Sequence, residues 1–202
     1  MNDELEEKGR FITVLFIIAA NCFPLAGLAI WDWNVYNIVF LYWLESMVIG
    51  FYNVIKMLSL DEDTNIGLTF LFSTGYFSYL SVILFAICSL FGGNGFFTQQ
   101  LTASLGALEP FKYQIALGAV SLVISHGISY FVHFIVRGER YDTDALTLFR
   151  APFKRIVFIQ ILLLSSGWWI HKTHAGIFYL VLMVLLKIAL DIHSHIQEHY
   201  GS

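Results

Sequence analysis

The stretch Val35–Leu58, which reads VYNIVFLYWLESMVIGFYNVIKML, decides the fold of this protein. It exceeds the roughly 20 predominantly apolar residues that an α-helix needs to cross the hydrocarbon core of a bilayer. Its two charged residues are Glu45, near the middle, and Lys56, near the end. The stretch therefore predicts a transmembrane helix that carries a carboxyl group at membrane depth.

The composition of the whole chain indicates the same class of protein. Of the 202 residues, 57% are hydrophobic and 13% are charged, whereas a soluble domain averages about 45–50% apolar and about 25% charged residues. So few charges cannot cover the surface that a soluble chain of this size exposes. The net charge of −4 also disfavours nucleic acid as a partner, because nucleic acid is bound by a basic face. The composition excludes a soluble enzyme, a disordered chain and a nucleic-acid-binding protein.

Further apolar runs predict that the chain crosses the membrane repeatedly. We expect an all-α, polytopic membrane protein with one domain of six transmembrane helices, at about residues 11–30, 35–58, 68–90, 113–136, 156–170 and 175–195. The acidic residues before the first run favour a retained helix over a signal peptide. Between the third and fourth spans, apolar residues at helical spacing predict an amphipathic helix in the membrane interface. They are Phe97, Leu101, Leu105 and Leu108.

Basic residues are distributed unequally between the two sides of the membrane, and this asymmetry sets the orientation. Two lie on the predicted outer side, Lys112 and Lys172. Eight lie on the other side, namely Lys8, Arg10, Lys56, Arg137, Arg140, Arg150, Lys154 and Arg155. The bias predicts that both termini lie in the cytoplasm and that the protein resides in the cell (inner) membrane.

The inner segment 137–155 is longer than a turn and alternates charged with apolar residues, with Pro152 as a break. We interpret it as a loop held to anionic lipid headgroups by Arg150, Lys154 and Arg155, since each basic residue near the surface contributes about 1 kcal/mol. The alternative is a basic pocket for a phosphate or carboxylate ligand.

Ionisable side chains within the spans are the candidate functional residues, because they are costly in lipid and usually face the protein interior. At about 1.5 Å per residue, they sort into a deep layer and a layer near the inner interface. The deep layer is Glu45, His126 and Lys187, and the inner layer is His133, Asp191 and His195, with Gln160. Along each span the polar residues recur at helical spacing, so we expect the second, fourth and sixth spans to pack around a polar interior. The three stripes are Glu45, Tyr52 and Lys56, then His126, Tyr130 and His133, and finally Lys187, Asp191 and His195.

The lead hypothesis for this interior is a metal site, because two imidazoles and a carboxylate suit zinc or non-haem iron. In it, His133, Asp191 and His195 are the ligands, and Gln160 supports them from outside the coordination shell. Glu45 and His126 transfer protons, and the protein is an enzyme that acts on a lipid or quinone. The basic residues of segment 137–155 bind the headgroup of that substrate.

Two other classes of function stay open. In a proton- or cation-coupled transporter or channel, Glu45, His126 and Asp191 relay protons or bind a cation. In a structural or assembly subunit, Lys187 pairs with the two carboxylates and fixes helix packing without catalysis. Association into a homo-oligomer is compatible with all three classes.

Three motifs in this order resemble an uncharacterised prokaryotic family of integral membrane proteins, a domain of unknown function. They are Tyr42–Glu45 (YWLE), Ser125–Tyr130 (SHGISY) and the C-terminal pattern from Leu186 to His199. The resemblance covers nearly the whole chain, from about Asn21 onward. It names no reaction, but it implies that Glu45, His126, Lys187, Asp191 and His195 belong to one pattern.

Overall fold

The computed structural model describes residues 23–27, 29–60, 65–92 and 95–153, short pieces at 156–157, 160–161 and 181–189, and residues 165 and 178. In this part of the chain the fold is all-α and contains no strand, as predicted. The chain forms two compact units. One comprises Tyr36–Leu164, and the other combines Met1–Val35 with Ser165–Ser202.

Three regions of the described chain are long and apolar enough to cross a membrane, namely Val35–Leu58, Ile66–Phe91 and Thr98–Val136. Helix α2 (Val35–Leu58) has the predicted bounds, and α3 (Asn65–Phe91) begins three residues earlier than expected. These helices support a membrane protein with several spans. The spans expected at 11–30, 156–170 and 175–195 lie largely outside the described residues.

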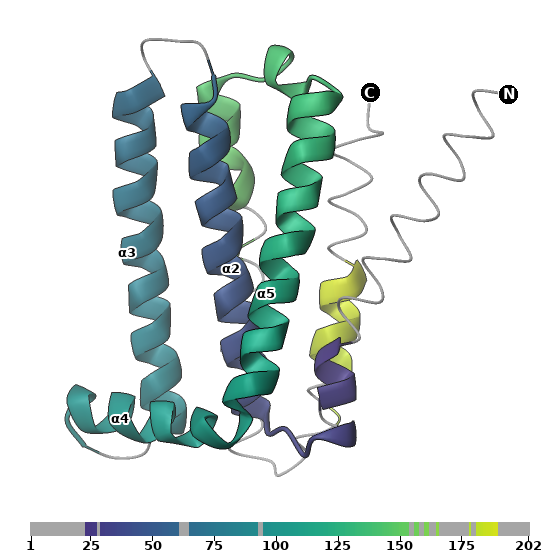
Figure 1. The fold of residues 1–202 in the computed structure, drawn as a ribbon. Helices are drawn as coiled ribbons and strands as arrows, with labels where there is room; N and C mark the ends of the chain where they lie inside the picture. The colour runs from purple at the N-terminus through teal and green to yellow at the C-terminus, as the bar shows by residue number, and fades with distance from the viewer. Residues whose placement is uncertain are drawn as a thin grey trace, which may run out of the picture. The chain divides into compact units, whose positions relative to one another are not determined.

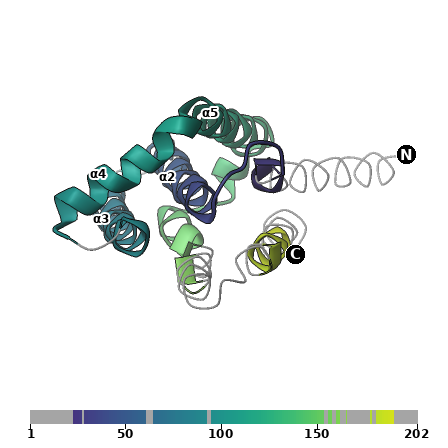
Figure 2. The ribbon, with the colours of Figure 1, turned by 90° about the horizontal axis from the view of Figure 1, so that it is seen from below.

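Helix α2 lies between α3 and α5 (Lys112–Ser129) within the unit Tyr36–Leu164 (Figures 1 and 2). Helices α2 and α5 run in the same direction and α3 runs in the opposite one (Figure 1). Lys56 stands in the last turn of α2. Its Nζ lies 5.3 Å from the centroid of the Phe134 ring, and Phe134 shortly precedes Arg137 in the sequence. Basic residues from α2 and from the end of the α5 region therefore share one end of this unit.

The amphipathic helix expected between the third and fourth spans is present as α4 (Phe97–Leu108). It lies across the end of α3 (Figures 1 and 2), and the Ser89 hydroxyl donates a 3.1 Å hydrogen bond to the Gln100 side-chain oxygen. Gly92 permits this approach, because a Cβ there would lie 2.5 Å from the Gln100 carbonyl oxygen. A short 3₁₀ turn, Glu109–Phe111, then leads into α5.

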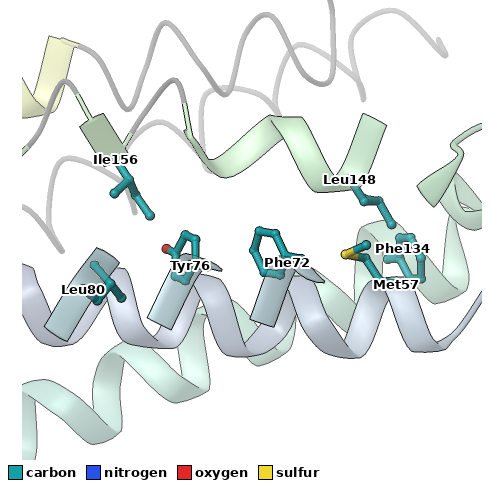
Figure 3. Packing of buried hydrophobic residues seen from close by; sticks show 7 residues of the cluster. All are labelled: Met57, Phe72, Tyr76, Leu80, Phe134, Leu148 and Ile156. Atoms are coloured by element: carbon teal, nitrogen blue, oxygen red, sulfur yellow. The ribbon is translucent and has the colours of Figure 1, made fainter. Parts of the chain in front are cut away.

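The core of this unit is an aromatic and aliphatic cluster that joins α2, α3 and the segments after residue 130 (Figure 3). Its buried members are Met57, Phe72, Tyr76, Leu80, Phe134, Leu148 and Ile156. Tyr76 packs directly on the backbone of α2, since a Cβ on Gly50 would lie 2.2 Å from its ring. This glycine makes room for the Tyr76 ring between α2 and α3.

The fourth span is not a regular α-helix to its end, which the sequence pattern did not reveal. After α5 the chain continues as a π-helix, η2 (Tyr130–Val136), in which the Arg137 amide donates to the Val132 carbonyl at 3.0 Å. Such i→i+5 segments are rare and occur frequently at functional sites. The expected bounds of the span, 113–136, are retained, but its last two turns are wider than predicted.

The inner segment 137–155 is partly helical, so its interpretation as a loop broken at Pro152 was wrong. Gly138, at φ +79°, starts the 3₁₀ turn η3 (Glu139–Tyr141), and residues 145–153 form a helix. The Asp144 carboxylate caps this helix by accepting a 2.8 Å hydrogen bond from the Thr147 amide. Hydrogen bonds with the Thr147 side chain and with its amide lower the pKa of Asp144. Leu148 and partly buried Phe149 of this helix pack into or against the core.

Pro152 does not end this helix because a side chain of α2 replaces the missing backbone bond. Proline has no N–H, so the carbonyl four residues earlier, that of Leu148, receives no helical hydrogen bond from it. The buried Asn53 side chain donates a 2.9 Å hydrogen bond to this carbonyl. Membrane helices tolerate proline when a neighbouring side chain satisfies the freed group in this way.

In the other unit, the described residues include an aromatic cluster of Phe23, Trp31 and Trp33, with ring centroids 5.6–5.9 Å apart. Trp33 lies against Gly27, where a Cβ would be 2.4 Å from its indole. Tryptophans beside the end of a membrane helix are typical of a membrane interface.

Candidate functional site

Polar side chains recur at seven-residue spacing along α2 and just past its end, and two of them, Tyr52 and Ser59, contact the 112–136 region. Glu45, Tyr52 and Ser59 are spaced by seven residues, and a heptad drifts by only about 20° around an α-helix. Each step is about 10 Å along the axis. Glu45 is 8% exposed. We call this contact between α2 and the 112–136 region the α2–α5 seam.

Tyr52 forms the centre of the α2–α5 seam. Its ring lies 6.4 Å from the His126 ring at an interplanar angle of 25°, and 6.1 Å from the Tyr130 ring. Its hydroxyl donates a 2.9 Å hydrogen bond to the Val123 carbonyl. Gly127 leaves room for this hydroxyl, since a Cβ at that position would lie 2.6 Å from it. The polar faces predicted for the second and fourth spans therefore do meet.

The next contact along the seam joins Tyr130 to Ser59, with the two hydroxyl oxygens 3.1 Å apart. The Ser59 hydroxyl donates to the Ile55 carbonyl at 2.7 Å. Since a serine hydroxyl has one proton and two acceptor lone pairs, Tyr130 donates to Ser59 in this pair.

His133 lies at the end of the seam, within the π-helix, between a cation and an anion. Its Nδ1 is 3.8 Å from the Glu139 carboxylate and 3.5 Å from an Arg137 guanidinium nitrogen. The His133 side chain is 13% exposed and that of Glu139 is 33% exposed. An imidazole can donate or accept a proton at its ring nitrogens, so His133 is a candidate proton-exchanging group.

A second polar group is buried on a neighbouring face of α2. The Ser46 hydroxyl donates to the Tyr42 carbonyl at 3.0 Å, and the Gln160 amide nitrogen donates to the Ser46 hydroxyl oxygen at 3.3 Å. The Tyr76 hydroxyl donates to the Ser46 carbonyl at 2.8 Å. Gln160 is 1% exposed. We call Ser46, Tyr76 and Gln160 the Ser46 cluster.

The structure describes part of the predicted site. Glu45, Gln160 and Lys187 are buried, His126 and His133 are partly buried, and Arg150 is exposed. Lys187 belongs to residues 181–189 of the other unit. Asp191, His195, Lys154 and Arg155 lie outside the described residues.

The described residues do not support the predicted metal site. Within the described part of the chain, no group of three or more His, Cys, Asp or Glu side chains is arranged to hold a metal ion. Of the three expected ligands, His133 is described, and its Nδ1 faces Glu139 and Arg137.

Sequence reasoning did not identify Ser46, Asn53 or Glu139 as site residues. Ser46 adjoins Glu45, and Asn53 lies on the buried face of α2. Both are polar residues inside a predicted span, and this property could have identified them as candidate site residues. Glu139 lies beyond the span and reaches His133 because the chain reverses at Gly138. The spacing of polar residues in the sequence does not predict this reversal.

A protein-family model matches residues 4–202, and the family that it describes is one of unknown function. No curated protein and no solved structure matches the chain.

Proposed function

The chain belongs to the family of unknown function DUF6498, and we propose that it is a proton-conducting component of a membrane transporter. In this proposal the protein spans the membrane several times with both termini in the cytoplasm. The α2–α5 seam carries protons between the cytoplasmic side and Glu45. Bound lipid surrounds the apolar outer faces of the helices.

The observation that carries this proposal is the succession of proton-exchanging groups along one helix contact. His133 and Glu139 stand at the end of the seam, Tyr130 and Ser59 follow, and Tyr52 with His126 lies deeper. Glu45 is one heptad beyond Tyr52 on the same face of α2. Where two groups are farther apart than a hydrogen bond, we expect chains of water molecules to bridge them.

The free-energy cost of placing ionisable side chains inside a membrane favours a functional role for these groups over an incidental one. An ionised side chain at the centre of a membrane helix costs about 2.5–3.5 kcal/mol on insertion scales and is by default a functional candidate. Histidine exchanges protons near neutral pH. Structural contacts between membrane helices use small residues and individual Ser, Thr, Asn, Gln or His hydrogen bonds, whereas the seam presents several proton-exchanging groups in succession.

The orientation in this proposal follows from the basic residues at the His133 end. Lys56 and Arg137 stand there, and Arg140 follows in η3. Positive residues near the ends of spans favour the cytoplasmic side. Protons would therefore enter or leave the seam from the cytoplasm.

The metal-dependent enzyme acting on a lipid or quinone is less well supported. Two of its ligands, Asp191 and His195, lie outside the described residues. We favour the proton pathway because its contacts come from described side chains.

The test is proton flux into liposomes that contain the purified full-length protein, followed with an internal pH dye after a pH step. We expect Glu45→Gln to remove the protein-dependent flux. The matched control is Glu109→Gln, because Glu109 is an exposed glutamate at the opposite end of α5, paired with Lys112. Equal flux through wild type and Glu45→Gln, or no flux above empty liposomes, would contradict the proposal.

A further inference from the structure

The end of the protein at which η2 finishes carries cations that are not paired with carboxylates. Lys56, Arg137 and Arg140 form no ion pair within the described part of the chain. The Lys56 ammonium lies instead over an aromatic ring of η2. At the opposite end of α5, by contrast, Lys112 pairs with the Glu109 carboxylate at 2.6 Å. The unpaired cations are therefore available to an anion from outside the protein.

The turn at Gly138 keeps Arg137 and Arg140 close to each other. Gly138 adopts φ +79°, and its carbonyl accepts a 2.9 Å hydrogen bond from the Tyr141 amide, so the chain reverses directly after η2. The two arginines are three residues apart on this turn, and at 3.8 Å per residue their Cα atoms are separated by at most about 11 Å. Both side chains are long enough to reach one anion that lies between them.

Arg140 also retains an unused hydrogen-bond donor. Its guanidinium lies over the Tyr141 ring, 4.6 Å from the centroid, and its Nη2 donates to the Tyr141 hydroxyl. The Arg140 Nε is buried and has no acceptor among the described residues. A buried donor without a partner is costly, and more so when the group is charged. Since Tyr141 is 72% exposed, the two side chains can shift together toward a ligand that supplies the missing acceptor.

The surroundings of this turn indicate which anion binds. Guanidinium groups recognise phosphate, because their planar donors match two of its oxygen atoms. Exposed apolar side chains of η2 adjoin the arginines, namely Phe131, Val132 and Val136. On a membrane helix such side chains face the acyl chains of lipids. The acyl chains of a phospholipid would therefore lie along η2 and bring its phosphate to the turn.

We propose that Arg137 and Arg140 bind the phosphate group of an anionic phospholipid, such as phosphatidylglycerol, at the end of η2. The carboxylate between them in sequence, that of Glu139, lies 3.8 Å from the His133 imidazole. Basic residues at the ends of spans attract anionic lipid headgroups, and these two residues give that attraction a defined site. The inference does not depend on proton conduction.

The experiment measures binding of tritiated phosphatidylglycerol to the purified, delipidated full-length protein in micelles of a neutral detergent. We expect saturable binding of one lipid per chain. Arg137→Gln and Arg140→Gln should each weaken binding about tenfold or more, because each removes a charged hydrogen-bond donor. Arg140→Lys should also weaken it, since lysine keeps the charge but lacks the planar guanidinium. Equal binding in the wild type and these three variants would overturn the site.

Two comparisons separate a defined site from general attraction between charges. Arg150→Gln removes a basic residue from the same inner segment, but Arg150 lies outside the turn and already interacts electrostatically with the Asp144 carboxylate. It should therefore weaken binding less than Arg140→Gln, and equal losses would overturn the site in favour of diffuse attraction. Lys112→Gln removes the same charge at the opposite end of α5 and should leave binding unchanged.

The turn is tested with two substitutions that add the same Cβ at Gly138. Alanine disfavours φ +79°, whereas asparagine tolerates the left-handed region. We expect Gly138→Ala to weaken binding and Gly138→Asn to retain most of it. Gly138→Asn also keeps the test informative should Gly138→Ala not fold. Wild-type binding in Gly138→Ala would contradict the role of the turn in positioning the arginines.

Competition identifies the source of the phosphate group. Inorganic phosphate should not displace phosphatidylglycerol even in large excess, because it lacks the acyl chains that lie along η2. Phosphatidylcholine, which has the same phosphodiester but no net charge, should compete weakly. Displacement by inorganic phosphate would overturn the lipid as the ligand, and equal competition by phosphatidylcholine would contradict the preference for an anionic headgroup.

Discussion

The substitution Gly127→Ala tests whether the contact between Tyr52 and α5 matters for proton movement. The new Cβ would lie 2.6 Å from the Tyr52 hydroxyl oxygen and 3.4 Å from the ring carbon that bears it. Ordinary contact begins at 3.4 Å, so the hydroxyl must retreat by about 0.8 Å. Its 2.9 Å hydrogen bond to the Val123 carbonyl would then exceed hydrogen-bonding distance.

The expected cost in stability is small, because two effects oppose each other. Loss of one hydrogen bond costs about 0.5–1.5 kcal/mol, whereas replacing a glycine inside a helix by alanine contributes about 0.5–1 kcal/mol. We therefore expect the free energy of unfolding to change by less than about 1 kcal/mol. Proton flux should fall at least about tenfold, since Tyr52 is displaced from His126, and a tenfold change corresponds to about 1.4 kcal/mol in the barrier.

The assay combines thermal unfolding in detergent with the liposome flux measurement. Gly75→Ala is the control, because nothing lies within 4 Å of a Cβ at that exposed position of α3. In a Tyr52→Phe background, which lacks the hydroxyl, Gly127→Ala should cause no further loss of flux. Wild-type flux through Gly127→Ala would refute the role of Tyr52, and a further loss in the Tyr52→Phe background would refute the steric explanation.

Three other predictions concern the packing that positions the seam. Gly50→Ala should destabilise the protein by about 1–3 kcal/mol in thermal unfolding, because its Cβ would lie 2.2 Å from the buried Tyr76 ring; a neutral effect would contradict the close α2–α3 contact. Asn53→Leu should cost about 1–3 kcal/mol, since it leaves the buried Leu148 carbonyl without its donor; an unchanged melting temperature would show that this bond is dispensable. The lowered pKa of Asp144 means that the helix it caps is favoured above the ordinary carboxyl pKa and loses that contribution as the pH falls through the lowered value. The protection factors of the amides of residues 145–153, which correct exchange rates for the pH dependence of an unstructured chain, should therefore fall on acidification in wild type. Asp144→Asn should remove this dependence; a persisting dependence would assign it to another group.

Much of the fold could be predicted from hydrophobicity, because length and apolar character alone define a membrane helix. Helix α2 begins and ends at the predicted residues, and α4 lies at its expected position. The contact of Tyr52 with His126 follows from heptad spacing on two helices. These features depend on local sequence and on period.

The features that could not be predicted depend on contacts between distant residues. The π-helix at Tyr130–Val136 departs from the period on which pattern analysis rests. The helix at 145–153 survives Pro152 because Asn53, far away in the sequence, bonds to the Leu148 carbonyl. The Glu139 contact with His133 requires the reversal at Gly138. In each case tertiary structure, not local preference, determines the backbone.

The most direct test of the proton pathway is infrared difference spectroscopy of the protein in lipid after a pH step. The carboxyl stretch of a protonated, buried glutamic acid reports directly on Glu45. We predict a reversible carboxyl band that is absent in Glu45→Gln and forms more slowly in Gly127→Ala. A band that persists in Glu45→Gln, or a Glu45 band that does not respond to the pH of the solution, would contradict the account.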